Sequence, residues 1–244
     1  MIAATVRRWA AWAPEREGRA AWQSWADAPA ALGVDGSPDV RFLPAMLRRR
    51  CSPLARMMLT AAFECCEEAE LTEVATVFAS RHGNINEAVG MFDRLARREA
   101  LSPTRFSHTV HNAQAGLFSI AAGNRQASSS LSAGEESFAC GYLEALTFLQ
   151  RKSQRPVLLV TADAPLCDTF APLVEEPRAA YAVALLLESA SGDAGMTLAL
   201  EPNVEAGAPA HWPGALEFLR WYLGDAPRLA LTGGVRRWVW QRAH

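Results

Sequence analysis

The hydrophobic positions along the chain follow two periods, which alternate from the N-terminus to the C-terminus. Short runs that are unbroken or alternating predict strands, whereas apolar residues that repeat every three or four positions predict helices. The strand pattern occurs at residues 2–12, 73–80, 128–132, 156–163, 179–188, 197–201, 229–232 and 235–240. The helical pattern occurs at residues 20–26, 53–65, 84–99, 113–122, 132–151 and 215–223. Strands that alternate with helices indicate a layered α/β domain with a mixed sheet.

Two of the predicted helices carry start signals. Ser52 can cap the helix that begins at Pro53, and proline suits the first turn of a helix. Ser132-Ala-Gly-Glu135 has the form of a capping box, which predicts Ser132 as the N-cap and Glu135 at the third helical position. The helix at 84–99 has one apolar face, made of Ala88, Met91, Phe92 and Leu95.

The connections between these elements are less regular. Residues 101–112 are expected to form a loop, and the uncharged run at 113–122 is expected to be a buried helix that ends at a glycine. The strand at 197–201 is expected to pair with the strand at 179–188 across a turn at 191–195.

Composition narrows the classes of function. Half of the 244 residues are hydrophobic, which suits one large domain, or one core with an appendage. The 24 Lys and Arg residues nearly balance the 26 Asp and Glu residues, so there is no electrostatic case for a nucleic-acid partner. Arg48-Arg49-Arg50 is expected to be a solvated helix face. Four tryptophans are expected to pack in the core, or to form a contact surface if exposed: Trp9, Trp12, Trp22 and Trp25.

The cysteines and the N-terminal sequence indicate the cellular compartment. The five cysteines are Cys51, Cys65, Cys66, Cys140 and Cys167, an odd number without C-x-x-C spacing. This pattern fits neither a secreted disulfide framework nor a zinc site, so we expect reduced thiols. Arg7 and Arg8 interrupt the apolar N-terminus, and no apolar run approaches the roughly 18 residues of a spanning helix. We therefore expect a cytoplasmic protein that has no membrane partner and binds no metal or other cofactor.

A series of short motifs runs through the middle of the chain: Ser102-Pro103-x-x-Phe106, Asn112-x-x-Ala115-Gly116, Ser119-Ile120 and Gly123, then the small-residue strand at 128–132. In this order and spacing the series resembles the N-terminal half of the β-ketoacyl synthases. Arg81-His-Gly-Asn84 is similar to the Gly-rich turn of the same half.

The resemblance covers about residues 40–190 and implies a thiolase-like fold. The expected architecture is a layered α/β/α domain with a mixed sheet and a truncated second half. Residues 1–190 are expected to form the ketosynthase N-terminal-like domain. Residues 191–244 are expected to be a short C-terminal extension, with a strand, a helix and a hairpin, that completes the same domain.

The resemblance also implies where the reactive group should lie. Condensing enzymes of this family hold the acyl chain as a thioester on a cysteine at a helix N-terminus, which lowers the thiol pKa. Counted from Asn112, that position falls on Glu135, with Gly134 and Glu136 as neighbours, and none of these can form a thioester. We therefore expect no catalytic residue. Glu135 is expected to cap its helix, with a residual chemical role as the open alternative.

Family members without the nucleophile are chain-length-factor subunits, which pair with a catalytic β-ketoacyl synthase as a heterodimer. This chain looks similar to the ketosynthase-like proteins of bacterial aryl polyene clusters. The resemblance implies contact with acyl carrier protein through the complex, and an interface beside the partner's acyl tunnel. The residues expected on that surface are Arg105, Phe106, His108, Thr109, Asn112, Gln114, Phe118, Ser128, Ser129 and Ser130. For Phe106 and Phe118 the alternative is an ordinary position in the core.

Two other functions stay open at this point. The chain could be an acyltransferase that acts alone, with Cys140 as nucleophile and His108 or His111 as its base. Against this, Cys140 lies more than one turn inside the predicted helix, where we expect a buried packing thiol. The chain could also be a homodimeric scaffold or binding protein that keeps only the fold.

Overall fold

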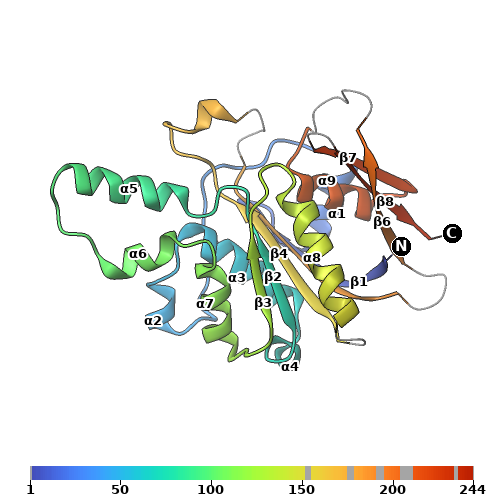
Figure 1. The fold of residues 1–244 in the computed structure, drawn as a ribbon, viewed down its shortest axis with the longest axis horizontal. Coiled ribbons are helices and arrows are strands. Elements are labelled where there is room, and N and C mark those ends of the chain that lie inside the picture. The colour runs from blue at the N-terminus through green and yellow to red at the C-terminus, as the bar shows by residue number, and fades with distance from the viewer. Residues whose placement is uncertain are drawn as a thin grey trace.

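The protein, seen here as a computed structural model, is built around one sheet of eight strands in the part of the chain that the structure describes (Figure 1). The described residues are 2–151, 155–174, 179–190, 195–203, 211–233 and 236–243. The strands are β1 (Ile2–Trp12), β2 (Ala75–Ala79), β3 (Ser128–Leu131), β4 (Val157–Asp163), β5 (Tyr181–Ser189), β6 (Met196–Pro202), β7 (Arg228–Gly233) and β8 (Arg236–Arg242). Their order across the sheet is β3-β2-β4-β5-β1-β6-β8-β7.

The sheet is mixed, as predicted. Strand β2 runs parallel to both β3 and β4, and every other neighbouring pair is antiparallel. Because the connections between the parallel strands must cross over the sheet, they contain the helices that lie between them in the chain. The three parallel strands therefore end at the same edge, and β3 is the outermost strand of that side.

The position of β1 corrects one prediction. Strand β6 does not pair with β5: β1 lies between them, in antiparallel register with both. The sequence of β1 explains this, because Trp9 and Ala11 are buried in one hydrophobic cluster and Ala10 and Trp12 in the other. A strand that is apolar on both faces is stable only inside a sheet that is covered on both sides. Residues 191–194 of the predicted turn lie outside the described residues.

One face of the sheet is covered mainly by α3 (Pro53–Cys65) and α7 (Ala113–Ala122), with α2 (Ala45–Arg48) and α4 (Glu68–Leu71) beside them. The predicted cap of α3 is confirmed, since the Ser52 hydroxyl accepts a bond from the Ala55 N–H at 3.1 Å. Helix α7 ends as expected at Gly123, whose φ of 64° is left-handed. It is only half-buried, however, because Ile120 faces outward with 68% of its surface exposed.

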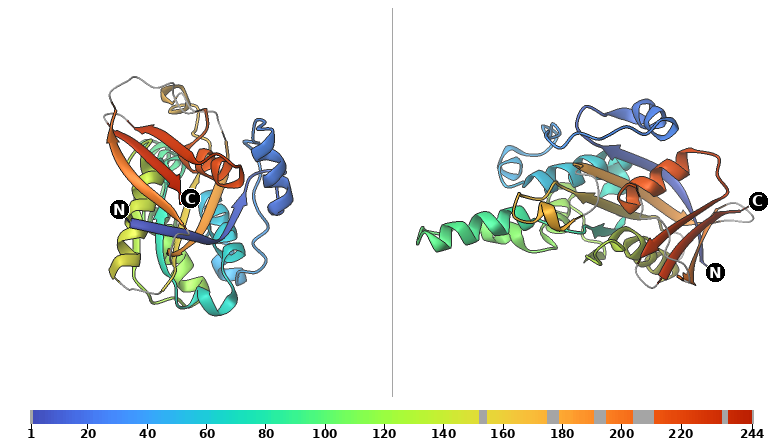
Figure 2. Two further views of the ribbon diagram at one scale, coloured as in Figure 1. Left: turned by 90° about the vertical axis from the view of Figure 1, so that its right-hand side faces the viewer. Right: turned by 90° about the horizontal axis from the view of Figure 1, so that it is seen from above.

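The opposite face carries α8 (Ser137–Arg151), α9 (Gly214–Leu223) and α1 (Gly18–Asp27), so the sheet lies between two helical layers (Figure 2). The four N-terminal tryptophans are all buried, which confirms the packing interpretation. Helix α8 approaches the sheet closely at Gly141. A Cβ at that position would lie 3.0 Å from the Ala79 side chain and 3.1 Å from that of Leu159.

Helices α5 (Ile85–Ala96) and α6 (Pro103–Thr109) form an arm that projects beyond the two layers (Figures 1 and 2). The prediction of a loop over 101–112 was wrong, because α6 is a helix whose first turn is capped by Ser102 and begins with Pro103. Of the apolar face predicted for α5, only Met91 is buried. Phe92 and Leu95 expose 67% and 58% of their surface.

After β5 the chain forms β6, then α9, then the antiparallel pair β7 and β8 that was predicted as a hairpin. A short 3-10 turn at Ala171–Leu173 lies in the connection from β4 to β5. No helix in the described part of the chain has the length and apolar character needed to cross a membrane.

The close contact at Gly141 generates the first prediction. Gly141→Val should lower the free energy of unfolding by about 1–3 kcal/mol, because the added carbons meet Ala79 and Leu159. Gly90→Ala in α5 is the matched control: a Cβ there has no neighbour within 4 Å, so helix propensity should raise stability by about 0.5–1 kcal/mol. Urea denaturation of both variants measures the difference. An equal effect of the two substitutions would show that α8 does not pack this tightly on β2 and β4.

Candidate functional site

The turn that follows β3 holds the position where a nucleophile was expected. Helix α8 begins at Ser137, not at Ser132, so the predicted capping box does not form. Ser132 instead donates its hydroxyl to the Arg81 carbonyl at 2.9 Å. The Ser137 hydroxyl accepts a bond from the Ala133 N–H at 2.9 Å and donates to the Gly134 carbonyl at 2.7 Å. Gly134 can take its φ of 60° because it has no side chain.

Glu135 does not cap the helix, which corrects the prediction for its side chain. Its carboxylate accepts a bond from the Arg81 guanidinium at 3.2 Å, and 64% of the side chain is exposed. The capping role fails because the turn between β3 and α8 is longer than the capping box requires. Glu136 packs under the end of β7, since a Cβ at Gly233 would overlap its side chain. A carboxylate in an ion pair can bind or orient, but it cannot carry an acyl thioester.

Cys140 lies closer to the helix start than predicted, in the first turn of α8, because that helix begins at Ser137. Even so, burial and the nearby Glu136 carboxylate raise the pKa of the Cys140 thiol, and Arg236 opposes this only in part. Both main effects disfavour the thiolate, which is the nucleophilic form. The side chain packs against the cluster on the α8 face of the sheet.

The two histidines proposed as partners of Cys140 make other contacts. His108 is on α6, which contacts α5 and α7, whereas α8 packs on the opposite face of the sheet from α7. Burial lowers the pKa of His108, with Glu87 acting in the opposite direction and Arg50 adding to the lowering. His111 donates a ring N–H to the Leu131 carbonyl at 2.6 Å, so that nitrogen is already used at the end of β3.

The residues predicted for a partner surface lie on α6, on α7 and on β3, and most of them are accessible. Phe106 is 61% exposed, and Arg105 is paired with Glu87 at 3.1 Å. Gln114 and Phe118 differ, because they are 3% and 1% exposed and face the core. The burial of Phe118 against Phe63 and Phe78 supports the alternative that it is a core aromatic.

An open groove runs between α7 and β3. It is lined by Asn112, Ala115, Gly116, Ser119, Ser128, Ser129 and Ser130. The side chains along it are small, and among the described strands β3 has a neighbour on one side only. The N–H groups of Thr76 and Ser80 bond to the carbonyls of Ala127 and Leu131. Because backbone groups alternate sides along a strand, those of Ser128 and Ser130 face the open edge.

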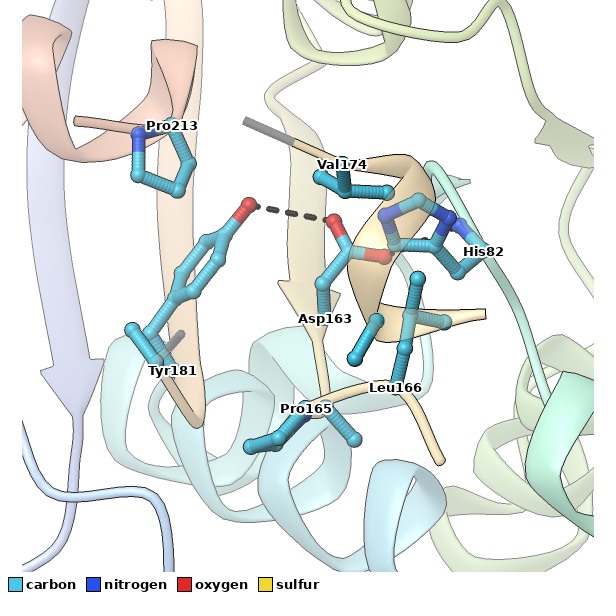
Figure 3. A pocket seen from close by; sticks show the side chains of 10 residues that line it. His82, Asp163, Pro165, Leu166, Val174, Tyr181 and Pro213 are labelled. Atoms are coloured by element: carbon cyan, nitrogen blue, oxygen red, sulfur yellow. Dashed lines mark hydrogen bonds between the residues drawn. The ribbon is translucent and has the colours of Figure 1, made fainter. Parts of the chain in front are cut away.

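A second polar group, which the sequence reasoning missed, lies where β2, β4 and β5 meet (Figure 3). The Asp163 carboxylate accepts bonds from the Ser80 hydroxyl at 2.8 Å, the His82 backbone N–H at 3.0 Å and the Tyr181 hydroxyl at 3.1 Å. The His82 ring lies beside it in a pocket whose other walls are apolar, among them Leu166, Val174 and Pro213. The sequence signal that could have indicated this group is Asp163, an acidic residue at the end of the apolar run Val157–Ala162.

The electrostatics of this pocket favour a structural role. Burial lowers the pKa of His82, the Asp163 carboxylate opposes this, and Arg81 adds to the lowering. The imidazole is therefore neutral near pH 7, while Asp163 joins the turn after β2 to the start of β5 through its three bonds. Among the described residues, no group of three or more His, Cys, Asp or Glu side chains is arranged to hold a metal ion.

Comparison with solved structures identifies this arrangement of strands and helices. The chain is similar to a chain in the structure of the ketosynthase ApeO in complex with its chain length factor ApeC from Xenorhabdus doucetiae. The two are 29% identical with a TM-score of 0.85, and the match covers 99% of this chain and 100% of that one.

More distant structures share the fold alone. The ishigamide ketosynthase/chain length factor is 15% identical with a TM-score of 0.61, over 83% of this chain and 68% of that one. A β-ketoacyl synthase from Burkholderia phymatum is 12% identical with a TM-score of 0.64, over 86% and 67%. The thiolase-like layered fold predicted from the sequence is thereby confirmed.

Among curated proteins, none matches the chain. The family model described as the N-terminal domain of β-ketoacyl synthase matches residues 22–241, a span that includes β6, α9, β7 and nearly all of β8. The chain belongs to the family of β-ketoacyl synthase N-terminal domains.

Proposed function

We propose that this protein is a non-catalytic, chain-length-factor-like subunit, which pairs with an active ketosynthase in fatty acid or polyene biosynthesis of the aryl polyene type. The observation that carries the proposal is the turn before α8. Counted along the motifs from Asn112, Glu135 falls at the position where family members that condense acyl chains have their cysteine, and its carboxylate is in an ion pair with Arg81. The chain keeps the architecture of a condensing enzyme and lacks its nucleophile at that position.

The similarity in length supports the same conclusion. The solved complex from Xenorhabdus doucetiae contains a ketosynthase and its chain length factor, and this chain aligns with one of its chains almost from end to end. The structure of a related system, AntDE with AntF, contains a ketosynthase and an acyl carrier protein. We infer that carrier protein reaches the present chain only through the assembled complex.

In this proposal the partner surface consists of α6, the outer face of α7 and the free edge of β3. The open backbone groups of Ser128 and Ser130 can extend the sheet into a second subunit, while the small groove residues allow close approach. Phe106 is the exposed aromatic that can reach the partner's acyl tunnel and set its depth. Gln114 and Phe118 support this surface from beneath.

Such a subunit shapes the partner's acyl tunnel and takes no part in forming or breaking bonds. A bulky side chain at the end of an apolar tunnel excludes further methylene groups, and each excluded group removes about 0.8 kcal/mol of favourable burial. The length of the product is then decided by the surface that this chain presents. A role for Cys140 in acyl transfer is less consistent with its raised pKa and with its separation from His108 by the sheet.

Co-expression tests the proposed pairing. With the ketosynthase of the same gene cluster, we expect a 1:1 complex in size-exclusion chromatography and condensation of acyl and malonyl carrier proteins only when both chains are present. Cys140→Ala should leave that activity unchanged, because the thiol is on the packing side of α8. Condensation by this chain alone that is lost in Cys140→Ala would favour the acyltransferase. A stable homodimer that ignores the synthase would favour the scaffold.

The free edge of β3 gives a sharper test. Ser130→Pro removes an N–H that faces away from β2, so the isolated chain should keep its stability within about 1 kcal/mol. The same substitution should weaken the complex at least about tenfold if the partner's strand bonds there. Ser129→Pro is the contrasting variant, because its N–H faces β2 and its loss should destabilise the chain itself. Binding of Ser130→Pro with wild-type affinity would exclude strand pairing at this edge.

A further inference from the structure

Cys65 and Cys66 form a pair of adjacent thiols that the proposed function does not use. Cys65 is the last residue of α3, and Cys66 follows it with an extended backbone, at φ −109° and ψ 148°. Within a helix, adjacent side chains do not face each other. Because the helix ends at Cys65, the two side chains come into hydrogen-bonding contact instead. Both are free thiols, and they expose only 1% and 9% of their surface.

The pair lies against the central strands of the sheet. The Cys65 Sγ atom is 3.5 Å from the Arg8 carbonyl oxygen of β1 and 3.6 Å from the Ala184 carbonyl oxygen of β5, and its S–H can donate to either of them. The register of β1 against β5 shifts between Val6 and Arg8. The Cys65 thiol is therefore a polar contact between α3 and the irregular part of the β1–β5 pair.

The charged groups around the pair come from β1 and from the chain that follows α3. The Arg8 guanidinium donates to the Cys65 carbonyl at 3.0 Å, and it is paired with Glu67 at 2.8 Å and with Glu70. Arg7 is paired with Glu70 as well, at 3.2 Å. The two carboxylates therefore anchor both arginines beside the sulfurs.

This environment makes the two sulfurs unequal. The hydrogen bond from Cys65 lowers the pKa of the Cys66 thiol, burial opposes this, and Arg8 and Arg7 add to the lowering. The same hydrogen bond raises the pKa of Cys65, and burial adds to the increase. Cys66 is thus the sulfur that ionises first, and Cys65 is the sulfur that keeps its proton. Because the thiolate is the reactive form, Cys66 is the nucleophile of the pair.

We infer that Cys65 and Cys66 are a site of reversible oxidation, at which hydrogen peroxide converts the two thiols into a disulfide between adjacent residues. The Cys66 thiolate attacks one peroxide oxygen, the O–O bond breaks, and Cys66 becomes a sulfenic acid. The hydroxide that leaves takes up the proton that Cys66 had released, which gives water. The Cys65 sulfur then displaces the hydroxyl group of the sulfenic acid, and this group leaves with the Cys65 proton as a second water. The two thiols together lose two electrons, and these reduce the peroxide.

The geometry of the pair determines both the oxidant and the stability of the product. The Cα atoms of adjacent residues are about 3.8 Å apart, which is less than the roughly 4.4–6.8 Å usual for a disulfide. A bond between them is strained and is easily reduced, as is typical of regulatory and not of structural disulfides. Burial of both sulfurs excludes bulky oxidants such as oxidised glutathione, whereas hydrogen peroxide is close in size to water. The site is independent of the proposed pairing, so either can fail without the other.

Peroxide treatment of the full chain, followed by mass spectrometry, tests the site. The chain is treated with an equimolar amount of hydrogen peroxide, denatured and labelled with N-ethylmaleimide. Trypsin then releases residues 57–81, which contain Cys65 and Cys66 and no other cysteine. We expect this peptide to lose two hydrogen atoms and to carry no label, while Cys51 and Cys140, whose pKa values are raised by burial, stay labelled. Dithiothreitol should restore both thiols. An intact pair at a dose that oxidises Cys51 overturns the inference, and so does a sulfinic acid that dithiothreitol does not reduce.

The pH dependence of the oxidation rate tests the role of Cys66. The rate should rise with pH as Cys66 ionises, and Arg7→Gln should move this profile to higher pH, because Arg7 helps to lower the pKa of Cys66. Near pH 7 the variant should react about threefold more slowly. Arg94→Gln is the matched control, since Arg94 is also in an ion pair and its side chain is 40% exposed, against 42% for Arg7. Equal profiles for the two variants would overturn the assignment of Cys66 as the attacking thiolate.

Oxidation should also change the stability of the sheet. Once the S–H of Cys65 is lost, the carbonyls of Arg8 and Ala184 lose that donor. We expect the thermal midpoint of the oxidised chain to fall by about 2–4 °C and to return after reduction. Cys66→Ser cannot form the disulfide and keeps the S–H of Cys65, so peroxide should leave its midpoint unchanged. An equal decrease in Cys66→Ser would place the effect at another residue and overturn the link between this site and the sheet.

Discussion

The structure depends on burying β1 on both of its faces. Trp9 and Ala11 contribute to the cluster beneath α8 and α9, and Ala10 and Trp12 to the cluster beneath α3. With both faces apolar, the strand is stable only between two others and between two helical layers. Its central place joins β5 to β6, so that strands from the beginning, middle and end of the chain belong to one sheet. The rigid sheet then fixes the two places on which the proposed function depends, which are the ends of the parallel strands and the open edge at β3.

At the strand ends, polar side chains hold the backbone together. Asp163 bonds to the turn after β2 and to the start of β5, and Arg81 pairs with Glu135 before α8. Family members that condense acyl chains place reactive groups at this edge of the sheet. Here the acidic and basic groups stabilise turns, and the raised pKa of Cys140 leaves the nearby thiol protonated. At these strand ends the thiolase-like fold is thus held together by hydrogen bonds and an ion pair.

The open edge of β3 differs from the strand ends, because its outward-facing backbone groups have no strand partner within the described part of the chain. Small residues line the groove beside β3, and α7 turns Ile120 outward. On the arm, Phe92 and Phe106 are exposed as well, and the root of the arm is fixed by Asn84 and Asn86. The exposure of Phe92 and Phe106, in a chain that buries β1 so completely, is consistent with the proposed pairing with a second subunit. Shape and position on this side are its proposed contribution to the reaction.

The sequence by itself determined the strands and helices with strong periods, the cap at Ser52 and the end of α7 at Gly123, because these depend on neighbours a few residues away. The order of short motifs was sufficient to indicate the family. Tertiary structure decided the place of β1, the start of α8 at Ser137, and which face of α5 is covered. It also assembled the Asp163 cluster from three strands. Local spacing determines which side chains share a face of a helix or strand. Only the packing of the whole chain determines which residues cover that face, or whether it stays exposed.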